Sequence, residues 1–516
     1  MALLTLSWTH IGLGLAALII ATLARAVYRL TLHPLAKFPG PKLAAVSYKY
    51  EFFYDGIRPG TYNSHIALLH ATYGPVVRIN PSELHISDPR FIDTLYAVGG
   101  RRRDKSAYFL NAFGSIAAMS GFATPGHEHH RLRRAPLNRF FSRASIARLE
   151  PLVHELAQRL CDRLLAWEGR GSFDVAMAYS CYTTDVITAY CFGQAHGFLD
   201  REGGGWEPNL RPAIHAGCRT LPVMRQWPWI FSIINSLPDA LAKAMDPDLA
   251  IWIDHLNALT AHIGTIKARF DKGGKADLPE SVFVELLQSD LPDAEKTVPR
   301  LGAEASSLIS AGTETTAWTL SVLTFHLLDK PAMLERLTGE LDRAAPDPKR
   351  LPPWASLERL PFLSACILEA LRLSYGVATR LARVAPDEDL VYEGKGVRYV
   401  IPRGTAVSMA NPLIHHNEEI FPEPLEFVPE RWLDGKGGRR RDLEGYLLSF
   451  SKGSRQCLGM NLAYAELYVG AAAVVLRVLP RMELVETTVR DVRYHHEVFI
   501  PAVDPESKGV RVAIKA

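Results

Sequence analysis

Apolar residues recur at intervals of three and four positions through most of the chain after residue 45, which is the spacing of helices that bury one face. Strand-like alternation is confined to short pieces such as residues 75–87 and 397–410. The pattern therefore predicts one large, mainly α domain with small β-sheets. The clearest helical runs are residues 145–167, 246–270, 304–330 and 362–376.

The first 24 residues differ from the rest because they contain no Asp, Glu, Lys or Arg. Such a segment is long enough to cross the roughly 30 Å hydrocarbon core of a bilayer as one helix. Positive flanks stay in the cytoplasm, so Arg25 and Arg29 place the bulk of the chain on that side. The alternative is a cleaved signal peptide, since Ala24–Ala26 resembles a cleavage site, although no charged segment precedes the apolar run.

Three prolines follow this segment, Pro34, Pro39 and Pro41, and proline cannot continue a helix. We therefore expect a transmembrane anchor at residues 1–30, a stiff proline-rich spacer at 31–45 and the globular domain at 46–516.

Composition narrows the choice of function. The chain of 516 residues is 48% apolar and 22% charged, so it can bury a sizeable core. A formal charge of +3 and the lack of a basic stripe argue against a nucleic-acid partner. The six cysteines lack the spacing of a zinc site and are too few for a disulfide scaffold, which favours a reducing compartment.

One cysteine, Cys457, stands apart in the segment FSKGSRQCLG, between Gly453 and Gly459. The residues after it are strongly helical, and a helix N-terminus favours a thiolate. A thiolate is either a nucleophile, which would need a His and an Asn or Asp that the sequence leaves open, or a metal ligand. A single thiolate on a haem iron fits this loop better: Phe450 would shield the sulfur, Arg455 would meet a propionate, and Gly459 would let the porphyrin lie flat.

The spacing F-x-x-G-x-R-x-C-x-G resembles the haem-binding signature of the cytochrome P450 family. Three further segments resemble other marks of that family, in the same order along the chain. The resemblance runs from about Pro34 to the C-terminus and includes the anchor. The segments are AGTETT at 311–316, EALR at 369–372 and FVPERW at 427–432.

The resemblance implies the P450 fold and haem b with Cys457 as the iron ligand. It also implies that Ala311 lies against the haem and that Glu314 and Thr315 relay protons to the distal oxygen. Taken alone, AGTETT has a simpler interpretation, because threonines inside helices usually bond the carbonyl four residues earlier.

The family further implies a buried network of Glu369, Arg372 and Arg431 that holds the cysteine loop in place. Alone, an E-x-x-R pair is only an exposed helical ion pair worth a few tenths of a kcal/mol.

By the same resemblance, His130, Arg134 and Arg383 would meet haem propionates, although 130–142 could also be a basic helix face in solvent. Residues 377–382, 109–124 and Phe499 would line the substrate pocket.

The implied function is a haem-thiolate monooxygenase that activates O2 with NADPH electrons supplied by NADPH–cytochrome P450 reductase. The segments look most like fungal secondary-metabolism members of the trichodiene oxygenase type, which suggests hydroxylation or epoxidation of a terpenoid or another small apolar secondary metabolite at the endoplasmic reticulum membrane. Two alternatives stay open: a haem-thiolate isomerase or dehydratase that needs no external electrons, and a non-enzymatic haem sensor or electron carrier. The basic segment 434–442 and Lys452 are expected to face the reductase, unless they are only a solvated loop.

Overall fold

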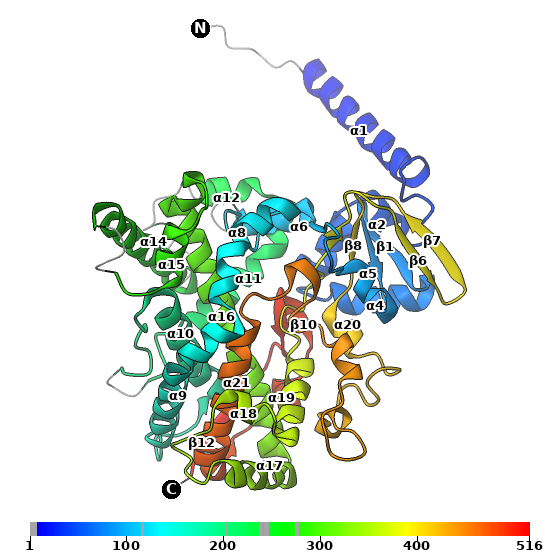
Figure 1. Ribbon diagram of the computed structural model, residues 1–516. Helices are drawn as coiled ribbons and strands as arrows, with labels where there is room; N and C mark the ends of the chain where they lie inside the picture. The colour runs from blue at the N-terminus through cyan, green and yellow to red at the C-terminus, as the bar shows by residue number, and fades with distance from the viewer. Residues whose placement is uncertain are drawn as a thin grey trace.

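The computed structural model describes residues 8–114, 118–201, 205–234, 236, 241, 247–273 and 278–515. Residues 1–7 of the predicted anchor and 115–117 of the predicted pocket segment lie outside the described residues. Helices form most of the body, and a five-stranded sheet and a two-stranded hairpin lie at the side from which α1 projects (Figure 1). The mainly α fold with small sheets is therefore confirmed.

The longer helices include each of the four helical runs predicted from the sequence. They are α1 (Trp8–Thr31), α4 (Tyr62–Tyr73), α8 (His127–Phe140), α9 (Arg143–Leu165), α10 (Val175–Phe192), α11 (Leu210–Gln226), α14 (Pro247–Gly273), α16 (Val298–Asp329), α17 (Pro331–Ala344), α19 (Pro361–Ser374) and α21 (Met460–Arg477). Shorter ones are α2 (Lys42–Val46), α3 (Lys49–Phe52), η1 (Phe53–Ile57), η2 (Pro89–Phe91), α5 (Ile92–Leu95), α6 (Ala107–Leu110), η3 (Asn111–Phe113), α12 (Trp229–Ile234), α15 (Val282–Gln288), η4 (Asp293–Lys296), α18 (Trp354–Leu357), α20 (Asn411–His415), η5 (Pro429–Trp432), η6 (Asp442–Tyr446), η7 (Gly453–Arg455), η8 (Leu479–Arg481) and η9 (Val489–Asp491).

The largest sheet has the strand order β1-β2-β8-β5-β3, in which only β2 and β8 are parallel. The other sheets are β6-β7, β10-β11 and β4-β12-β9. The predicted strand segments 75–87 and 397–410 contain β1 with β2 and β7 with β8. The strands are β1 (Val76–Asn80), β2 (Glu83–Ile86), β3 (Asp104–Lys105), β4 (Phe173–Asp174), β5 (Arg383–Val384), β6 (Leu390–Gly394), β7 (Val397–Ile401), β8 (Ala406–Ser408), β9 (Met482–Leu484), β10 (His496–Val498), β11 (Ile500–Ala502) and β12 (Arg511–Ile514).

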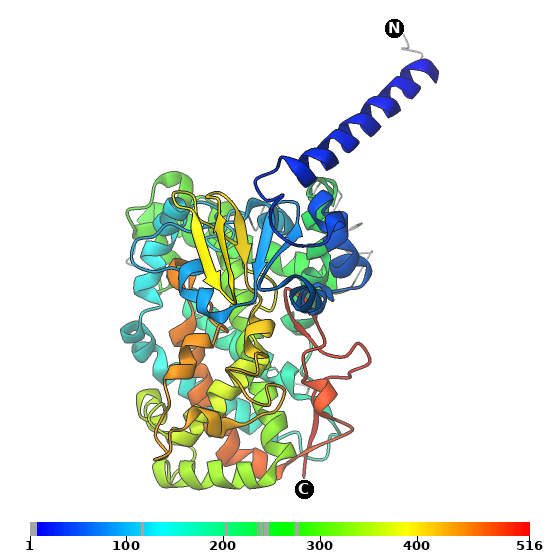
Figure 2. The ribbon, with the colours of Figure 1, turned by 90° about the vertical axis from the view of Figure 1, so that its right-hand side faces the viewer.

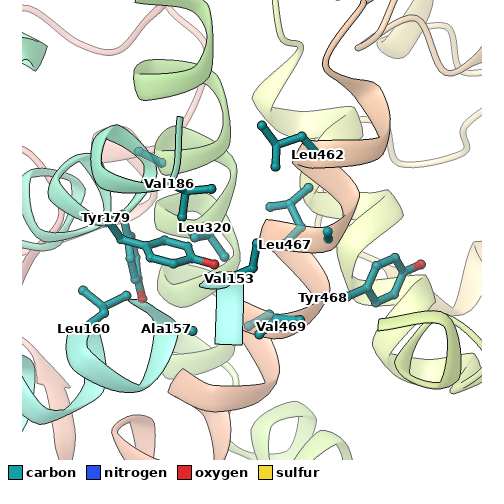
Figure 3. Packing of buried hydrophobic residues seen from close by; sticks show 14 of the residues in the cluster. Val153, Ala157, Leu160, Tyr179, Val186, Leu320, Leu462, Leu467, Tyr468 and Val469 are labelled. Atoms are coloured by element: carbon teal, nitrogen blue, oxygen red, sulfur yellow. The ribbon is translucent and has the colours of Figure 1, made fainter. Parts of the chain in front are cut away.

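The main core lies where α9, α10, α16 and α21 meet. Figure 3 shows Val153 of α9, Tyr179 of α10, Leu320 of α16 and Leu467 of α21, all of which are buried. Removing such a side chain costs about 2–5 kcal/mol, because the cavity closes only partly. This packing fixes the position of α16, which contains the AGTETT segment, and of α21, which directly follows the cysteine loop.

The N-terminal helix α1 projects away from the domain, and Figure 2 shows the same arrangement from the side. It is the one helix among the described residues that is long and apolar enough to cross a membrane, from His10 to Thr31, and none of this stretch is buried.

The proline-rich segment after α1 packs on the domain instead of standing between it and the anchor. Leu35 and Phe38 are buried among β1, β2 and β7, and α2 begins inside the predicted spacer. The guanidinium of Arg78 on β1 donates a 2.8 Å hydrogen bond to the carbonyl of Arg29, the last basic residue of α1. The prolines do end the helix, but two apolar side chains between them fold the segment back.

Candidate active site

The cysteine loop is a tight turn directly before α21. The Cys457 N–H donates to the Phe450 carbonyl at 2.9 Å, and the Gln456 N–H donates to Gly453 at 3.0 Å. Gly453 has a φ of +73°, and a Cβ there would meet the Tyr96 carbonyl oxygen at 2.4 Å. Only glycine fits this position, so the turn that follows α5 (Ile92–Leu95) and the cysteine loop come into close backbone contact.

Cys457 is the one exposed cysteine of the six. No atom lies within 4 Å of the place where a Cβ on Gly459 would stand, so the loop faces open space on that side. The ring of Phe450 packs against Tyr464 of α21, with 5.1 Å between centroids.

Cys457 is exposed to the open space beside the loop, but this space lies within the protein. The resulting desolvation raises the pKa of the Cys457 thiol, while the Gly459 N–H and the Arg134 guanidinium lower it, and the net shift is upward. The sequence predicted that the helix N-terminus would favour the thiolate, and this effect is present but smaller than that of burial. A metal that binds here would displace the thiol proton.

Four cations gather near this loop, and we call Lys105, Arg134, Arg383 and Arg455 the cation cluster. In the part of the chain that the structure describes, none has a carboxylate within 4 Å. Arg134 donates to the Gln456 carbonyl at 2.6 Å, and Arg455 donates to the carbonyls of Thr124 and Pro125 at 2.7 and 2.6 Å.

In the described part of the chain, the electrostatics of the cluster show that its positive charge is only weakly compensated. Lys105 and Arg383 stand directly opposite each other on β3 and β5, where like charges are unfavourable. Burial, Arg383 and Arg134 lower the pKa of Arg455 to about 9 although Asp104 opposes them, and among the described residues its Nε has no hydrogen-bond partner. Burial and the arginines also lower the pKa of Lys105 well below its usual range. This arrangement can bind a ligand that carries more than one negative charge.

His130 lies on α8, one turn before Arg134, and is buried. Burial, Arg455 and Arg134 lower its pKa to about 2, so it is a neutral imidazole. Lys105 was missed by sequence analysis, because in RRRDK it looks like one more charge of a solvated loop.

On α16, the hydroxyl of Thr315 donates to the carbonyl of Ala311 at 2.9 Å. Ala311 is exposed and Thr315 half-buried, although most of the C-terminal half of α16 is buried. This face of the helix therefore borders open space within the domain, as Gly459 does.

Glu314 points the other way and is buried against α11. Its carboxylate accepts hydrogen bonds from Arg211 at 3.0 Å and from His215 at 2.9 Å. Burial alone would raise the pKa of Glu314, but Arg211 and His215 outweigh it and hold the pKa below its usual value. Glu314 is thus an ionised partner of α11 and not a free acid.

Glu369, Arg372 and Arg431 lie in one buried network. Arg372 donates to Glu369 through two nitrogens at 2.7 and 2.9 Å, and Arg431 donates to the same carboxylate at 3.0 Å. Trp432 completes the carboxylate shell at 2.8 Å, and Arg372 also donates to the carbonyls of His415 and Glu426. The network ties α19 to the segment that leads into the cysteine loop.

Several of the predicted pocket residues form an apolar cluster, whereas Arg380 of the predicted segment 377–382 pairs with Asp55 at 2.7 Å. Phe113 and Phe122 contact Phe499 edge-on, with centroids 5.6 and 6.0 Å apart, and Val377 and Leu381 pack against the same group.

In the predicted reductase loop, Arg439 pairs with Glu444 at 2.8 Å and Arg440 with Asp442 at 2.6 Å. Lys452 lies 3.6 Å from Asp93. Much of the positive charge expected there is therefore neutralised locally by carboxylates that the sequence interpretation left out of account.

In comparisons with known proteins, residues 52–486 match the cytochrome P450 family. The chain belongs to the cytochrome P450 family. A P450 monooxygenase of Ascocoryne sarcoides is 41% identical over 504 residues, covering 95% of both chains. Tryptophan 6-hydroxylase of Fusarium equiseti is 39% identical over 98% of this chain and 97% of its own. N-acetyltryptophan 6-hydroxylase of Emericella nidulans is 40% identical over 99% and 98%. The protein is a P450 monooxygenase of the type found in fungal secondary metabolism, and the cofactor of this family is haem with a thiolate-bound iron.

Proposed function

We propose that this P450 takes electrons from NADPH through a reductase and inserts oxygen into a small apolar secondary metabolite at the endoplasmic reticulum membrane. One observation carries the proposal: an exposed cysteine on a tight loop faces open space, beside a cation cluster that has no carboxylate partner within 4 Å among the described residues. A flat, dianionic metal cofactor fits both.

In this proposal Cys457 would bind the iron, and Arg134, Arg383, Arg455 and Lys105 would neutralise the two propionates. His130, which stays neutral, would donate a hydrogen bond. Gly459 leaves room for the ring above the loop, and Ala311 would border it from α16.

Haem with a thiolate ligand supplies the activation of molecular oxygen. The chain then has to deliver protons to one side of it, and Thr315 is the hydroxyl that borders the open space. Because Glu314 is ionised, it would first take up a proton from His215, whose imidazole is hydrogen-bonded to its carboxylate. An enzyme that rearranges peroxides without external electrons has no need of this pair.

The substrate class rests on the apolar cluster around Phe499. A terpenoid suits its apolar surface. Aromatic amino-acid derivatives are a second candidate, because two relatives carry tryptophan or N-acetyltryptophan in their names and the cluster is rich in phenylalanine.

The test is turnover with a fungal reductase and NADPH, using a sesquiterpene hydrocarbon and N-acetyltryptophan as probes under isotopically labelled O2. We expect NADPH-dependent product that carries one labelled oxygen atom. Product formed from a peroxide substrate without NADPH would favour the isomerase alternative, and spectral changes without NADPH consumption would favour a sensor.

Replacing Thr315 with alanine should leave haem binding intact and raise the hydrogen peroxide released per NADPH several-fold, because the hydroxyl that borders the site is lost. Glu314→Gln should act in the same direction. The matched control is Thr319→Ala, one turn further along α16, whose hydroxyl faces Ser374 at 2.9 Å. An unchanged peroxide share in Thr315→Ala would leave AGTETT as helix packing only.

We also propose that α1 anchors the protein with its domain in the cytoplasm. Leu32 is 76% exposed and Leu43 of α2 is 72% exposed, so apolar surface continues from the base of α1 onto the domain. Apolar residues in this position suit the boundary of a bilayer.

Deleting residues 1–24 should move the protein to the soluble fraction with its haem spectrum retained. Deleting residues 1–31 should do the same but lower the free energy of unfolding by about 1–3 kcal/mol more, because buried Arg78 loses its acceptor on Arg29. A mature protein that begins after Ala26 would show a cleaved signal instead.

The reductase would bind on the side of the Cys457 loop. Since Arg439 and Arg440 are paired within their own loop, Arg441, which is exposed, is the residue of this loop that we expect to contribute most to docking. Such surface charge acts mainly on the association rate and weakens as salt screens it.

A further inference from the structure

A buried polar site lies within the helical core where α10, α16 and α21 meet, apart from the cysteine loop and the cation cluster. Glu466 of α21 is 1% exposed and Tyr182 of α10 is fully buried. Among the described residues, Glu466 Oε1 and the Tyr182 hydroxyl both lack a hydrogen-bond partner. Buried polar atoms in native proteins are rarely left so, and two together point to a ligand.

The two unpartnered groups lie on adjoining surfaces. Tyr182 packs on Gly470, one turn after Glu466 on the same helix, with its hydroxyl 3.6 Å from where a Cβ of Gly470 would stand. Glu466 also acts on Tyr182 electrostatically, since it adds to the rise in the pKa of Tyr182 that burial causes. One water molecule is the ligand that such a pair most simply accommodates.

The carboxyl of Glu466 has to be neutral. In the regions that the structure describes, no cation lies within 4 Å of it, and an unpaired buried carboxylate is too costly to keep ionised. Burial raises its pKa well above the usual range, and the hydrogen bond with Thr316 opposes this only in part. Glu466 therefore carries an O–H group at neutral pH.

Thr316 connects this site to the reaction, because it directly follows Thr315. On the same stretch of α16, Thr183 of α10 donates to the Thr313 carbonyl at 2.6 Å, and Thr184 contacts the Thr313 hydroxyl at 3.0 Å. Polar groups of α10 and α21 thus hold the turn 313–316 from behind, and this turn carries the hydroxyl of Thr315.

We propose that Glu466 is a positioning residue: its carboxylic acid and the Tyr182 hydroxyl bind one internal water and, through Thr316, fix the rotation of α16 that directs Thr315. The inference rests on the proposed function. Glu466 itself contacts neither substrate nor haem in this proposal, so it acts only through the helix.

The first test is an infrared difference spectrum of the full protein against Glu466→Gln at neutral pH. We expect the wild type to show the C=O stretch of a protonated carboxylic acid that the variant lacks. No lost band would mean that Glu466 is ionised and would overturn the proposal. This measurement needs no electrons and no substrate.

The second test measures hydrogen peroxide released per NADPH oxidised, with reductase and no added substrate. Glu466→Gln should stay within two-fold of wild type, because an amide keeps both a donor and an acceptor, whereas Glu466→Leu and Tyr182→Phe should raise the share several-fold. Tyr468→Phe is the matched control, since it removes a buried hydroxyl of α21 that faces Ser364 on α19.

If Tyr182→Phe and Glu466→Leu both give the wild-type share, the site is structural only. If Glu466→Gln is as damaging as Glu466→Leu, the acid donates protons and does not merely position. If Glu466→Leu fails to fold, the peroxide shares of Tyr182→Phe and Glu466→Gln still test the positioning role. If the wild type oxidises no NADPH, the proposed function is contradicted. The infrared result does not depend on turnover, so it would still test the protonation of Glu466.

Discussion

Cys457→Ala is expected to abolish the red-shifted Soret band that marks a thiolate ligand in the reduced carbon monoxide complex. The loss should be complete, because the other five cysteines are not exposed and none lies beside the cation cluster. Difference spectra of the purified protein measure it directly.

Cys218→Ala provides the control, since Cys218 is half-buried on α11 and burial raises the pKa of its thiol to about 12. That variant should keep the band. If the band survives in Cys457→Ala, another residue binds the iron and the proposed site is wrong.

The second large effect concerns Glu369. Replacing it with alanine leaves Arg372, which is fully buried, and Arg431 without their shared carboxylate. Losing one partner of a buried ion pair costs about 3–5 kcal/mol, a large part of the 5–15 kcal/mol by which proteins are typically stable. We expect little haem-loaded protein, and a lower midpoint in chemical denaturation for what remains.

A matched surface pair lies next to this network. Glu430 precedes Arg431 and pairs with Arg336 at 2.7 Å, with both side chains about half exposed. Glu430→Ala should lower the free energy of unfolding by about 1 kcal/mol or less. Equal losses in the two variants would show that burial of the Glu369 network adds nothing to its strength.

The sequence predicted the parts of the site that depend on local spacing. Helical periodicity located α16 and α19, and the glycine at 453 marked the turn that brings the loop against Tyr96. Spacing alone indicated only an exposed ion pair between Glu369 and Arg372, three positions apart on one face of a helix, and the buried network was implied by the resemblance to the P450 family. Contacts of this kind join residues that are close in the sequence, so they can be predicted from the sequence alone.

Relations across the fold could not be predicted this way. Glu314 finds Arg211 and His215 about a hundred positions away, and only the packing of α11 on α16 brings them together. The direction of the shift in the pKa of Cys457 depends on how deeply the loop is buried, which no local pattern gives. Lys105 is recognisable only from its place opposite Arg383 in a β-pair.

In the proposed membrane-anchored arrangement, the contact between Arg78 and Arg29 affects how the domain would lie relative to a bilayer. With the carbonyl of Arg29 held by β1, and Leu35 and Phe38 buried just beyond, α1 has no free joint at its base. If the thickness of the bilayer tilts α1, the whole domain is therefore expected to tilt with it. Each residue inserted between Arg25 and Arg29 would turn the apolar stretch of α1 by about 100° relative to the domain. The rotation of α1 would therefore set the orientation of the domain above the membrane, and with it the part of the protein surface that faces compounds dissolved in the lipid.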